Sequence, residues 1–574
     1  MTRTAERRRR WAARAASLVV AAVALSGCAA IPTSGPVIQG DTVVQGFNAP
    51  GLRARGPAVG DDPKGIVSGF LTAQAAGPAG DFDVAQEFLT SDDWDWKTQV
   101  LVFDGDLDLT YDEEAMQTGA VTVTGSASVV GALDKRGVYT EDVPVSTVVS
   151  FGLVRRSDGQ WRIETAEDGL LLSQSAFLAA FRSTRLYFPS ADREVLVPDE
   201  RWFPNRTWQT NAVDETLVGP VEWLRGSTDV VVPEGTRLSI DAVTNEGGVV
   251  DVRLTDAISL ASPEDRALLK AQLEATLFDA VPLTVNLYRG EDLLSTPSGG
   301  PVLAKADAVG NEVVAAQGQV MTLETGADDL VPLAPAVSLE GIDATALAQG
   351  ANARPLVVRD GTSNLLRLPT KTLPGVTLLT GDDLLAPSVD RLGGVWSGPR
   401  AQAGVLQVVR SDLADAGTPV EVAAPWLAGR SVQSIRVAHD GARIAVVSSD
   451  ALGATRVDVA GIVRDEKDVP TALSEPFRVG APIRSASQVV WADETLLAVL
   501  GTDEAETSPA VHLVAVGGDT TRLSPVAGAT AISAGDGERT VQVLTENGTL
   551  FGRSRSGAVW EKRIEGVALP TFPG

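Results

Sequence analysis

Cysteine is almost absent from this chain: Cys28 is the only one in 574 residues. The sequence therefore excludes disulfide bonds within the chain and metal sites built from several thiolates. Histidine is nearly as rare, because only His439 and His512 are present, far from the spacing of a zinc-protease helix. No phosphate-binding loop of the Gly-x4-Gly-Lys-Ser/Thr type occurs either. We therefore expect no enzyme activity, no metal site and no cofactor.

Positive charge and long apolar runs are also scarce. The chain has 48 Lys and Arg against 74 Asp and Glu, a formal net charge of −26. Nucleic acids and anionic lipid headgroups are bound mainly through Lys and Arg contacts to phosphate, so we expect no nucleic-acid partner. The apolar stretch 15–25 is about half as long as the roughly 20 residues that a transmembrane helix needs.

The N-terminus has the layout of an export signal. Six arginines between Arg3 and Arg14 precede the apolar stretch, which ends in Leu25-Ser26-Gly27-Cys28. This tetrad resembles the bacterial lipoprotein signal box. The resemblance implies removal of residues 1–27, an S-diacylglycerol group on Cys28 and N-acylation of the new amine with a fatty acid such as palmitate. An ordinary secretory signal with an incidental cysteine is the alternative.

Two or more acyl chains anchor a protein durably. We therefore expect a protein that is lipid-anchored to the extracytoplasmic face of the cell membrane. Residues 28–60 are rich in Gly, Pro and Ala and show no sustained apolar period, which predicts a flexible tether between the lipid and the folded part.

An α+β domain is predicted over residues 61–184. Ile66, Val67, Phe70 and Leu71 have helical spacing after Pro63, and a second short helix is expected over 84–89. Strand-like runs follow at 99–103, 120–130, 146–155 and 160–165. The last run contains Gly159-Gln160-Trp161-Arg162-Ile163, which resembles a late strand of the cone-shaped NTF2-like fold.

A second α+β unit is predicted over residues 185–309. Ser262 is expected to cap a helix, with Pro263 at its first position and Asp265 completing a capping-box-like pattern. Leu269, Leu273 and Leu277 then form one apolar stripe, and a strand is expected over 283–288. A leucine-containing stretch ending in Gly219-Pro220, a Pro-x-Gly-Thr turn at 233–236 and this later helix together resemble the GerMN domain.

Short β-rich runs and turns fill residues 310–574, without a convincing long helix. Similar turns recur at Asp390, Asp440, Asp493 and Asp536, a spacing that fits four-stranded propeller blades. Asn547-Gly548 between two apolar runs predicts a hairpin. The pattern favours an irregular β-propeller of five or six blades; a pair of β-sandwiches is the alternative.

The order of these features resembles the actinobacterial lipoprotein LpqB family. The resemblance rests on the signal box, the segment 31–37 (Ile-Pro-Thr-Ser-Gly-Pro-Val), the helix around Phe70, Phe88-Leu89-Thr90 with Trp94, and the run 196–204, followed by the GerMN-like unit and the propeller. It implies an outward-facing accessory protein that binds the extracytoplasmic domain of the sensor histidine kinase MtrB and regulates the MtrA–MtrB two-component system, which controls cell-wall homeostasis and cell division. The residues alone leave two alternatives open: a peptidoglycan-binding or wall-processing lipoprotein with a carboxylate site in the propeller, and an envelope-assembly scaffold.

Few residues outside the signal box invite a chemical role. His439 is expected in a blade turn, and His512 in a strand, exposed or hydrogen-bonded. The run Gly552-Arg553-Ser554-Arg555-Ser556 lacks the final glycine of a nucleophile elbow. The acidic run 104–108 lacks the loop glycine and the later glutamate of an EF-hand, so we expect it to form a half-buried strand. Tryptophan is enriched at interface hot spots, and we expect one or two tryptophans to be exposed.

Overall fold

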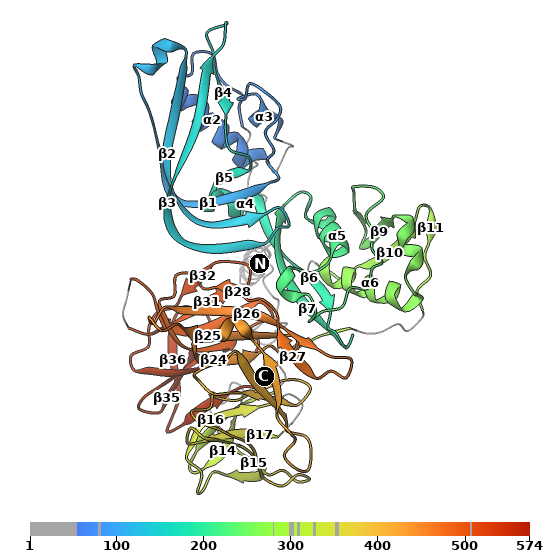
Figure 1. Ribbon diagram of the computed structural model, residues 1–574, viewed down its shortest axis with the longest axis vertical. Helices are drawn as coiled ribbons and strands as arrows, with labels where there is room; N and C mark the ends of the chain where they lie inside the picture. The colour runs from blue at the N-terminus through green and yellow to red at the C-terminus, as the bar shows by residue number, and fades with distance from the viewer. Residues whose placement is uncertain are drawn as a thin grey trace, which may run out of the picture. The chain divides into compact units, whose positions relative to one another are not determined.

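The computed structural model describes residues 54–77, 82–278, 281–297, 303–306, 310–324, 329–350, 355–505 and 508–574. These residues lie in one compact unit, Ala49–Gly574. Along the chain they form three regions with separate sheets: a first region (54–180), a middle region (181–306) and a propeller region (310–574) (Figure 1). No helix within these ranges combines the length and the apolar character needed to cross a bilayer.

The first region is a helix packed on a five-stranded sheet. Helix α2 (Pro63–Ala76) begins after Asp62, whose Oδ1 accepts a hydrogen bond from the backbone N–H of Gly65 at 2.7 Å. Its buried face of Ile66, Val67 and Phe70 joins the core of the sheet. The sheet has the order β4-β3-β2-β1-β5, with strands β1 (Gln99–Tyr111), β2 (Ala120–Asp134), β3 (Tyr139–Arg155), β4 (Trp161–Thr165) and β5 (Leu170–Ser173). The predicted α+β character of this region is confirmed.

Two short helices complete the first region. Helix α3 (Asp83–Gln86) is followed by the buried Phe88 and Leu89, and α4 (Gln174–Ala180) follows β5. Strand β1 continues through the acidic run 104–108, where Asp106 and Asp108 are exposed and Leu109 is buried. This alternation is that of a half-buried strand, as the sequence predicts.

The middle region starts with a long hairpin. Strands β6 (Phe181–Pro189) and β7 (Val195–Pro204) pair in antiparallel register from Phe181 with Pro204 to Pro189 with Leu196, so β6 crosses position 185. Helix α5 (Trp208–Val218) follows, then a second sheet with the order β11-β10-β9-β8. Its strands are β8 (Thr244–Glu246), β9 (Val249–Leu254), β10 (Thr284–Arg289) and β11 (Asp292–Leu293), and β12 (Ala304–Lys305) joins β7.

Helix α6 (Pro263–Thr276) lies between β9 and β10 in the chain and fulfils its prediction. The Ser262 hydroxyl accepts a hydrogen bond from the backbone N–H of Asp265 at 3.0 Å, and Pro263 occupies the first turn. Leu269, Leu273 and Leu277 are at most 1% exposed. Because the cap, the first-turn proline and the apolar stripe are all local signals, the sequence could place this helix correctly.

The propeller region contains six blades within the residues that the structure describes. The first comprises β13 (Glu312–Ala316), β14 (Gln319–Leu323) and β15 (Leu330–Ser338) with the last strand of the chain, β37 (Ala568–Thr571). The second is β16 (Ala344–Gln349), β17 (Leu356–Asp360), β18 (Asn364–Arg367) and β19 (Val376–Thr380). The third is β20 (Ser388–Val389), β21 (Gly394–Ser397), β22 (Val405–Arg410) and β23 (Val420–Ala423).

The fourth blade comprises β24 (Ser431–Val437), β25 (Arg443–Ser449), β26 (Thr455–Arg464), β27 (Pro470–Leu473) and β28 (Phe477–Val479), and a β23–β27 contact joins it to the third. The fifth is β29 (Ser485–Trp491), β30 (Leu496–Thr502), β31 (Ala510–Ala515) and β32 (Thr520–Arg522). The sixth is β33 (Ala529–Ser533), β34 (Gln542–Thr545), β35 (Thr549–Arg553) and β36 (Trp560–Glu565).

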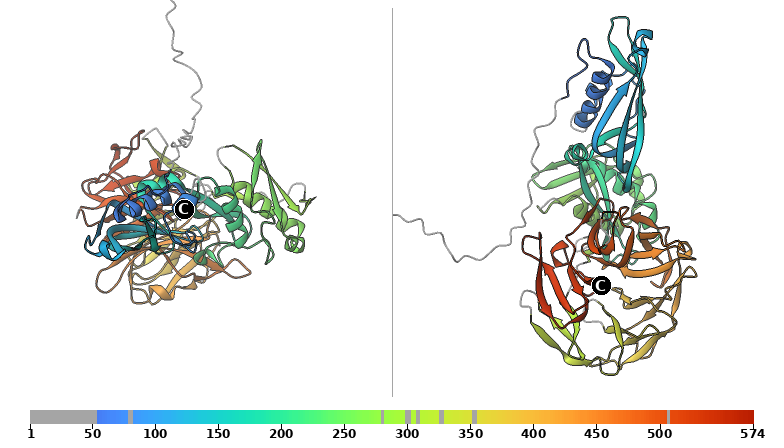
Figure 2. Two further views of the ribbon diagram at one scale, coloured as in Figure 1. Left: turned by 90° about the horizontal axis from the view of Figure 1, so that it is seen from above. Right: turned by 90° about the vertical axis from the view of Figure 1, so that its left-hand side faces the viewer.

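The four similar turns predicted from the sequence occupy equivalent places. Asp390, Asp440, Asp493 and Asp536 follow β20, β24, β29 and β33, the first strands of four successive blades. The blades surround a centre in which the right-hand view of Figure 2 marks the C-terminus. Strand β37 pairs with β13 and so closes the ring with the two ends of the propeller sequence. The predicted propeller is confirmed.

Candidate functional site

The signal-box residues predicted from the sequence, Leu25, Ser26, Gly27 and Cys28, lie outside the described residues. The lipid attachment at Cys28 therefore stays a prediction. The candidate sites that the structure presents are a cavity in the propeller, a small pocket in the first region and an apolar surface on the middle region.

The propeller encloses a cavity of about 390 Å³, called the channel below. First strands of four blades line it, namely β16, β24, β29 and β33, together with β37. Its size lies within the range of small-molecule sites. The lining contains three arginines, Arg359, Arg400 and Arg436, and no aspartate or glutamate.

The three arginines differ in how the protein satisfies them. Arg400 lies 3.4 Å from the Asp383 carboxylate and donates to Gln433 Oε1 at 2.9 Å. Arg359 donates to Thr345 Oγ1 at 2.8 Å and to the carbonyl of Leu384 at 2.7 Å. Burial and the neighbouring Arg400 lower the pKa of Arg359, against the opposing effect of Asp383. The guanidinium groups of Arg359 and Arg400 therefore repel each other across the channel wall.

Arg436 is the least satisfied of the three. Its Nη2 donates to the Phe572 carbonyl at 3.0 Å and, at 3.4 Å, to Thr571 Oγ1. Within the described part of the chain it forms no ion pair with a carboxylate. The surrounding protein lowers its pKa to about 10, because desolvation disfavours the charged guanidinium. The side chain is nevertheless only half-buried, since it faces the cavity.

The C-terminal segment lies at one end of the channel. Thr571 belongs to the lining, the N–H of Gly574 donates to the carbonyl of Gln349 at 2.9 Å, and Pro573 and Gly574 are buried. His439 Nε2 lies 3.0 Å from the Pro573 carbonyl oxygen, and His439 also lines a separate cavity of about 190 Å³ with Lys305 and Glu494. Residues of this segment therefore line the channel and contact the lining of the second cavity.

A buried carboxyl group lies beside the channel wall. Glu312, at the start of β13, is 2% exposed and accepts hydrogen bonds from the Ser533 hydroxyl and the Gln542 amide. Burial raises its pKa to about 7, although both hydrogen bonds and the more distant Arg563 act in the opposite direction. This group holds a proton at mildly acidic pH, and it links the first and sixth blades.

The histidines occupy the predicted elements. His439 lies in the turn after β24, and burial lowers its pKa. His512 lies in β31, is 1% exposed, and its Nε2 is 3.3 Å from Asp503 Oδ2, so it is the hydrogen-bonded strand histidine of the two forms expected. In the part of the chain that the structure describes, no three His, Cys, Asp or Glu side chains gather in a metal-binding group.

The expectation of one or two exposed tryptophans is wrong for the described residues, since all ten of their tryptophans are buried or half-buried. Trp396 and Trp491 are core residues at 0% and 2% exposure. Trp202 donates from Nε1 to the Gly517 carbonyl at 2.7 Å, so this half-buried residue of the middle region contacts the propeller. Tryptophan therefore does not identify the interface of this protein.

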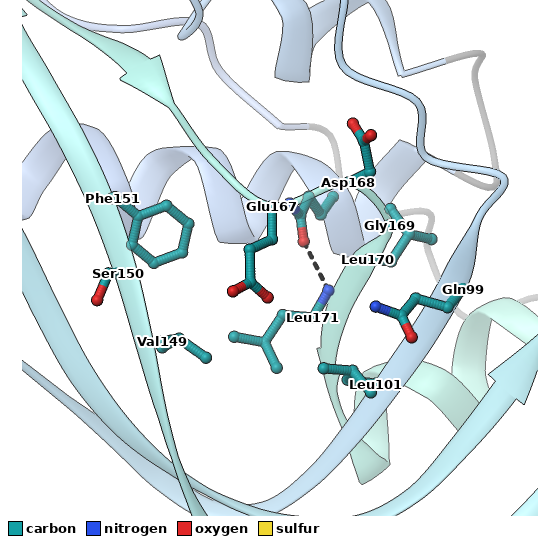
Figure 3. Close-up of a pocket in the computed structure, with 11 residues that line it drawn as sticks. Gln99, Leu101, Val149, Ser150, Phe151, Glu167, Asp168, Gly169, Leu170 and Leu171 are labelled. Carbon is teal, nitrogen blue, oxygen red and sulfur yellow. Dashed lines mark hydrogen bonds between the residues drawn. The ribbon is translucent and has the colours of Figure 1, made fainter.

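A pocket in the first region is much smaller than the channel. It has a volume of about 40 Å³, and Figure 3 shows Glu167 among Val149, Phe151 and Leu171. Gln74 Oε1 accepts a hydrogen bond from the backbone N–H of Leu171 at 2.9 Å, so this amide has a structural role. The volume is that of about one water molecule, which makes a larger ligand unsuitable here.

Half of the exposed large apolar side chains of the described residues lie on the middle region. Eight of the sixteen large hydrophobic side chains that are exposed in the described residues lie between 218 and 293: Val218, Val230, Ile240, Val249, Leu260, Phe278, Val281 and Leu293. Several of them flank strand β10. Val249 pairs in register with Thr284 at its start, where Val281 precedes it, and Leu293 pairs with Tyr288 near its end.

Leu260 belongs to the same end of β10 as Leu293. The hydroxyl of its neighbour Ser259 accepts a hydrogen bond from Arg289 Nη1 at 3.2 Å, and Arg289 pairs with Asp292. Leu260 is 81% exposed and Leu293 61%. Single exposed hydrophobic residues are normal on protein surfaces, whereas a contiguous apolar patch is typical of an interaction surface. We call the eight side chains the middle-region apolar surface.

Sequence reasoning missed both the channel arginines and this surface. The arginines come from separate parts of the propeller, and only the ring brings them to one cavity. The apolar residues of the middle region read as core positions in the sequence, because a strand such as β9 has buried Val250 and Val252 beside the exposed Val249. No local signal separates the two cases.

The fold and these sites define a multidomain β-propeller protein with an N-terminal α+β region. Comparison with known proteins specifies it further. The family model described as the lipoprotein LpqB β-propeller domain matches residues 297–573, and the model of the lipoprotein LpqB N-terminal domain matches residues 56–178. Neither model covers the middle region, so its GerMN-like character stays a prediction.

Relatives named lipoprotein LpqB match along nearly the whole chain. The protein of Cutibacterium acnes is 26% identical over 97% of this chain and 98% of its own length. The protein of Mycobacterium tuberculosis is 26% identical, with 92% of each chain covered. Among solved structures, apo AztD from Citrobacter koseri is 9% identical, with a TM-score of 0.26 over 46% of this chain and 96% of that chain. The chain belongs to the LpqB lipoprotein family.

Proposed function

We propose that this protein is a non-enzymatic lipoprotein, anchored through Cys28 to the extracytoplasmic face of the cell membrane. There it binds the extracytoplasmic domain of a sensor histidine kinase of the MtrB type. By this contact it regulates a two-component system of the MtrA–MtrB type, and through it cell-wall homeostasis and cell division.

The anchor part of the proposal is supported by the family and by the sequence. The relatives are named lipoproteins, and Cys28 ends a signal-box tetrad behind an arginine-rich, apolar leader. The net charge of −26 opposes binding to anionic lipid headgroups. A lipid on Cys28 supplies the membrane attachment that the charge of the protein does not.

The binding part is carried by the middle-region apolar surface. Residues such as Leu260 (81% exposed), Val281 (66%) and Leu293 (61%) present apolar area to solvent on the middle region. Burial of apolar area stabilises a protein complex by roughly 25 cal/mol per Å² before the costs of association. A folded partner domain with a complementary apolar face would gain this energy without opposing the negative charge of the protein.

Crosslinking and affinity capture from membranes test the partner. The full-length wild-type protein is expected to recover a sensor histidine kinase. Two double variants, Leu260→Glu with Leu293→Glu and Phe278→Glu with Val281→Glu, address the two ends of β10 separately. Leu452→Glu is the matched control, because Leu452 is an apolar residue of the propeller region with 95% exposure.

Loss of kinase capture in at least one double variant, with normal capture by the control, is the expected result. Substitutions at such exposed positions change stability by roughly 0.5 kcal/mol or less, so all variants should fold. Repeated failure of the wild type to recover any kinase contradicts the partner assignment. Equal capture by all variants contradicts the assigned surface.

Replacement of Cys28 tests the anchor. The Cys28→Ser protein lacks the sulfur that receives the diacylglyceryl group, so the precursor should stay uncut or be wrongly processed, and no mature lipidated form should be made. Detergent-phase partitioning and the mass of the mature N-terminus measure this outcome. Normal partitioning of the variant would be incompatible with lipid attachment at Cys28.

A further inference from the structure

We propose that the propeller channel is a binding site for a small, hydroxyl-rich molecule that carries an oxyanion group, a phosphate or a carboxylate, and that Arg359, Arg400 and Arg436 recognise this group. The inference is independent of the kinase partner. It rests on the composition of the cavity lining and on the unusual environment of Arg436.

The charges of other deeply placed arginines are balanced within the protein, although Arg443 Nη1 has no hydrogen-bond partner among the described residues. Arg201 pairs with Asp199 and Glu215, and Arg443 pairs with Asp440. Arg367 has no carboxylate partner, but its three guanidinium nitrogens donate to the carbonyls of residues 374, 411, 413 and 414. The fold thus provides either a carboxylate or a shell of carbonyls for a buried guanidinium.

Arg436 has neither form of compensation. Only its Nη2 donates to the protein, with two bonds, and in the described residues no acceptor receives a hydrogen bond from its Nε or Nη1. A guanidinium that is half-buried and lacks a carboxylate partner bears part of the desolvation cost of its charge. Such a cost is typical of sites whose compensating group is a ligand. Since Arg436 faces the cavity, the cavity is where this group would bind.

The rest of the lining specifies the kind of ligand. Arg359 and Arg400 add two further guanidinium groups, and Arg359 uses Nε and Nη1, but not Nη2, for its bonds to Thr345 and Leu384. Guanidinium groups recognise carboxylate and phosphate in bidentate geometry. Amide and hydroxyl side chains complete the wall, among them Gln433, Ser487 and Thr530. These groups suit the hydroxyls of a sugar-like molecule, and the volume of about 390 Å³ accommodates one.

The charge of the channel lining is opposite in sign to the net charge of the whole protein. A chain with a net charge of −26 repels anions in general, so three arginines without an acidic residue in the lining form a local exception. A wall-processing site with paired carboxylates would need the opposite lining. The channel therefore favours anion binding over carboxylate-based hydrolysis.

Calorimetric titration of the full-length protein in detergent tests the proposal. Inorganic phosphate and glucose 6-phosphate are the probes, glucose is the neutral control, and the ionic strength is held constant. Both phosphate probes should bind saturably in the millimolar range or below, glucose 6-phosphate more tightly than phosphate, and glucose alone more weakly than either. Absence of binding by both phosphate probes overturns the proposal. Equal affinity for both phosphate probes overturns its hydroxyl-rich part.

Arginine variants locate the binding. Arg436→Gln and Arg400→Gln should each weaken binding by roughly tenfold or more, the value of one hydrogen-bonded charge. Arg410→Gln is the matched control, because the Arg410 side chain is 54% exposed and pairs with Asp412 outside the lining. If Arg436→Gln fails to fold, Arg400→Gln decides, since its side chain is 31% exposed. Binding that survives both channel substitutions places the ion elsewhere and overturns the site.

Discussion

The middle region and the propeller differ in the kind of side chain that they expose. The middle region exposes apolar side chains to solvent, such as Leu260 and Leu293, while its arginine Arg201 is buried with two carboxylates. The propeller has a core of apolar blades and lines its channel with three arginines. Apolar area on an outer surface suits a protein partner, whereas three arginines around a cavity whose lining has no carboxylate suit a small anion. We therefore propose separate binding roles for the two regions of the chain.

The comparison is sharpest between Arg201 in the middle region and Arg436 in the channel. Arg201, in the middle region, is 0% exposed and pairs with Asp199 at 2.7 Å and Glu215 at 3.1 Å. Arg201→Ala leaves the buried Asp199 without its cation and Glu215 with Arg136 alone, so the free energy of unfolding should fall by roughly 3–5 kcal/mol. Chemical denaturation measures the loss. Arg225→Ala is the control, because that exposed pair with Glu222 should contribute about 1 kcal/mol or less.

Glu312 gives the next largest effect, and its sign depends on pH. Its pKa is about 7 in the folded protein against an ordinary value of 4.5, so the folded state retains a proton that the unfolded state has lost between these values. Stability should therefore decrease as the pH rises from about 4.5 to 7, by about 3 kcal/mol in total.

Glu312→Gln removes this ionisation from the propeller. The variant should be more stable than the wild type at pH 8 and should gain much less at pH 5, where Glu312 of the folded wild type is protonated. Its amide can still accept from Ser533, and the unpaired Gln542 Oε1 is available as an acceptor if the Gln542 amide turns over. Thermal unfolding of both proteins at the two pH values checks the difference. An unchanged pH profile would falsify the assignment to Glu312 of the stability loss between about pH 4.5 and 7.

The smallest stability effect is expected at Arg436. Because this arginine has no carboxylate partner, Arg436→Gln should change the free energy of unfolding by about 1 kcal/mol or less, and can raise it. A residue kept for binding typically costs stability, whereas a residue kept for folding supplies it. A loss as large as that of Arg201→Ala would show that Arg436 is a structural residue.

Local signals in the sequence account for the parts of the fold that were predicted. Ser262, Pro263 and Asp265 mark the start of α6, and Asn547-Gly548 marks the turn between β34 and β35. Each of these signals lies within a few residues of the element that it specifies. The recurring aspartate turns predicted blades for the same reason, since each turn adjoins the first strand of its own blade.

Long-range pairing accounts for what was missed. The four residues of β5 pair in parallel with β1, and β37 joins β13 from the other end of the propeller sequence. Neither pairing has a local signal, because each is selected by packing across the fold. The channel depends on the same closure: Arg436 lies in β24, but its acceptor Phe572 directly follows β37. Its position could therefore be found only from the structure.

The most direct test of separate binding roles is whether kinase capture and phosphate binding can be lost independently. Kinase capture and phosphate binding are measured on the same two full-length proteins: the Leu260→Glu, Leu293→Glu double variant and the Arg400→Gln, Arg436→Gln double variant. The first should lose the kinase and still bind phosphate, and the second should lose phosphate and still capture the kinase. If either protein loses both activities while it remains folded, the middle region and the channel do not have separate roles.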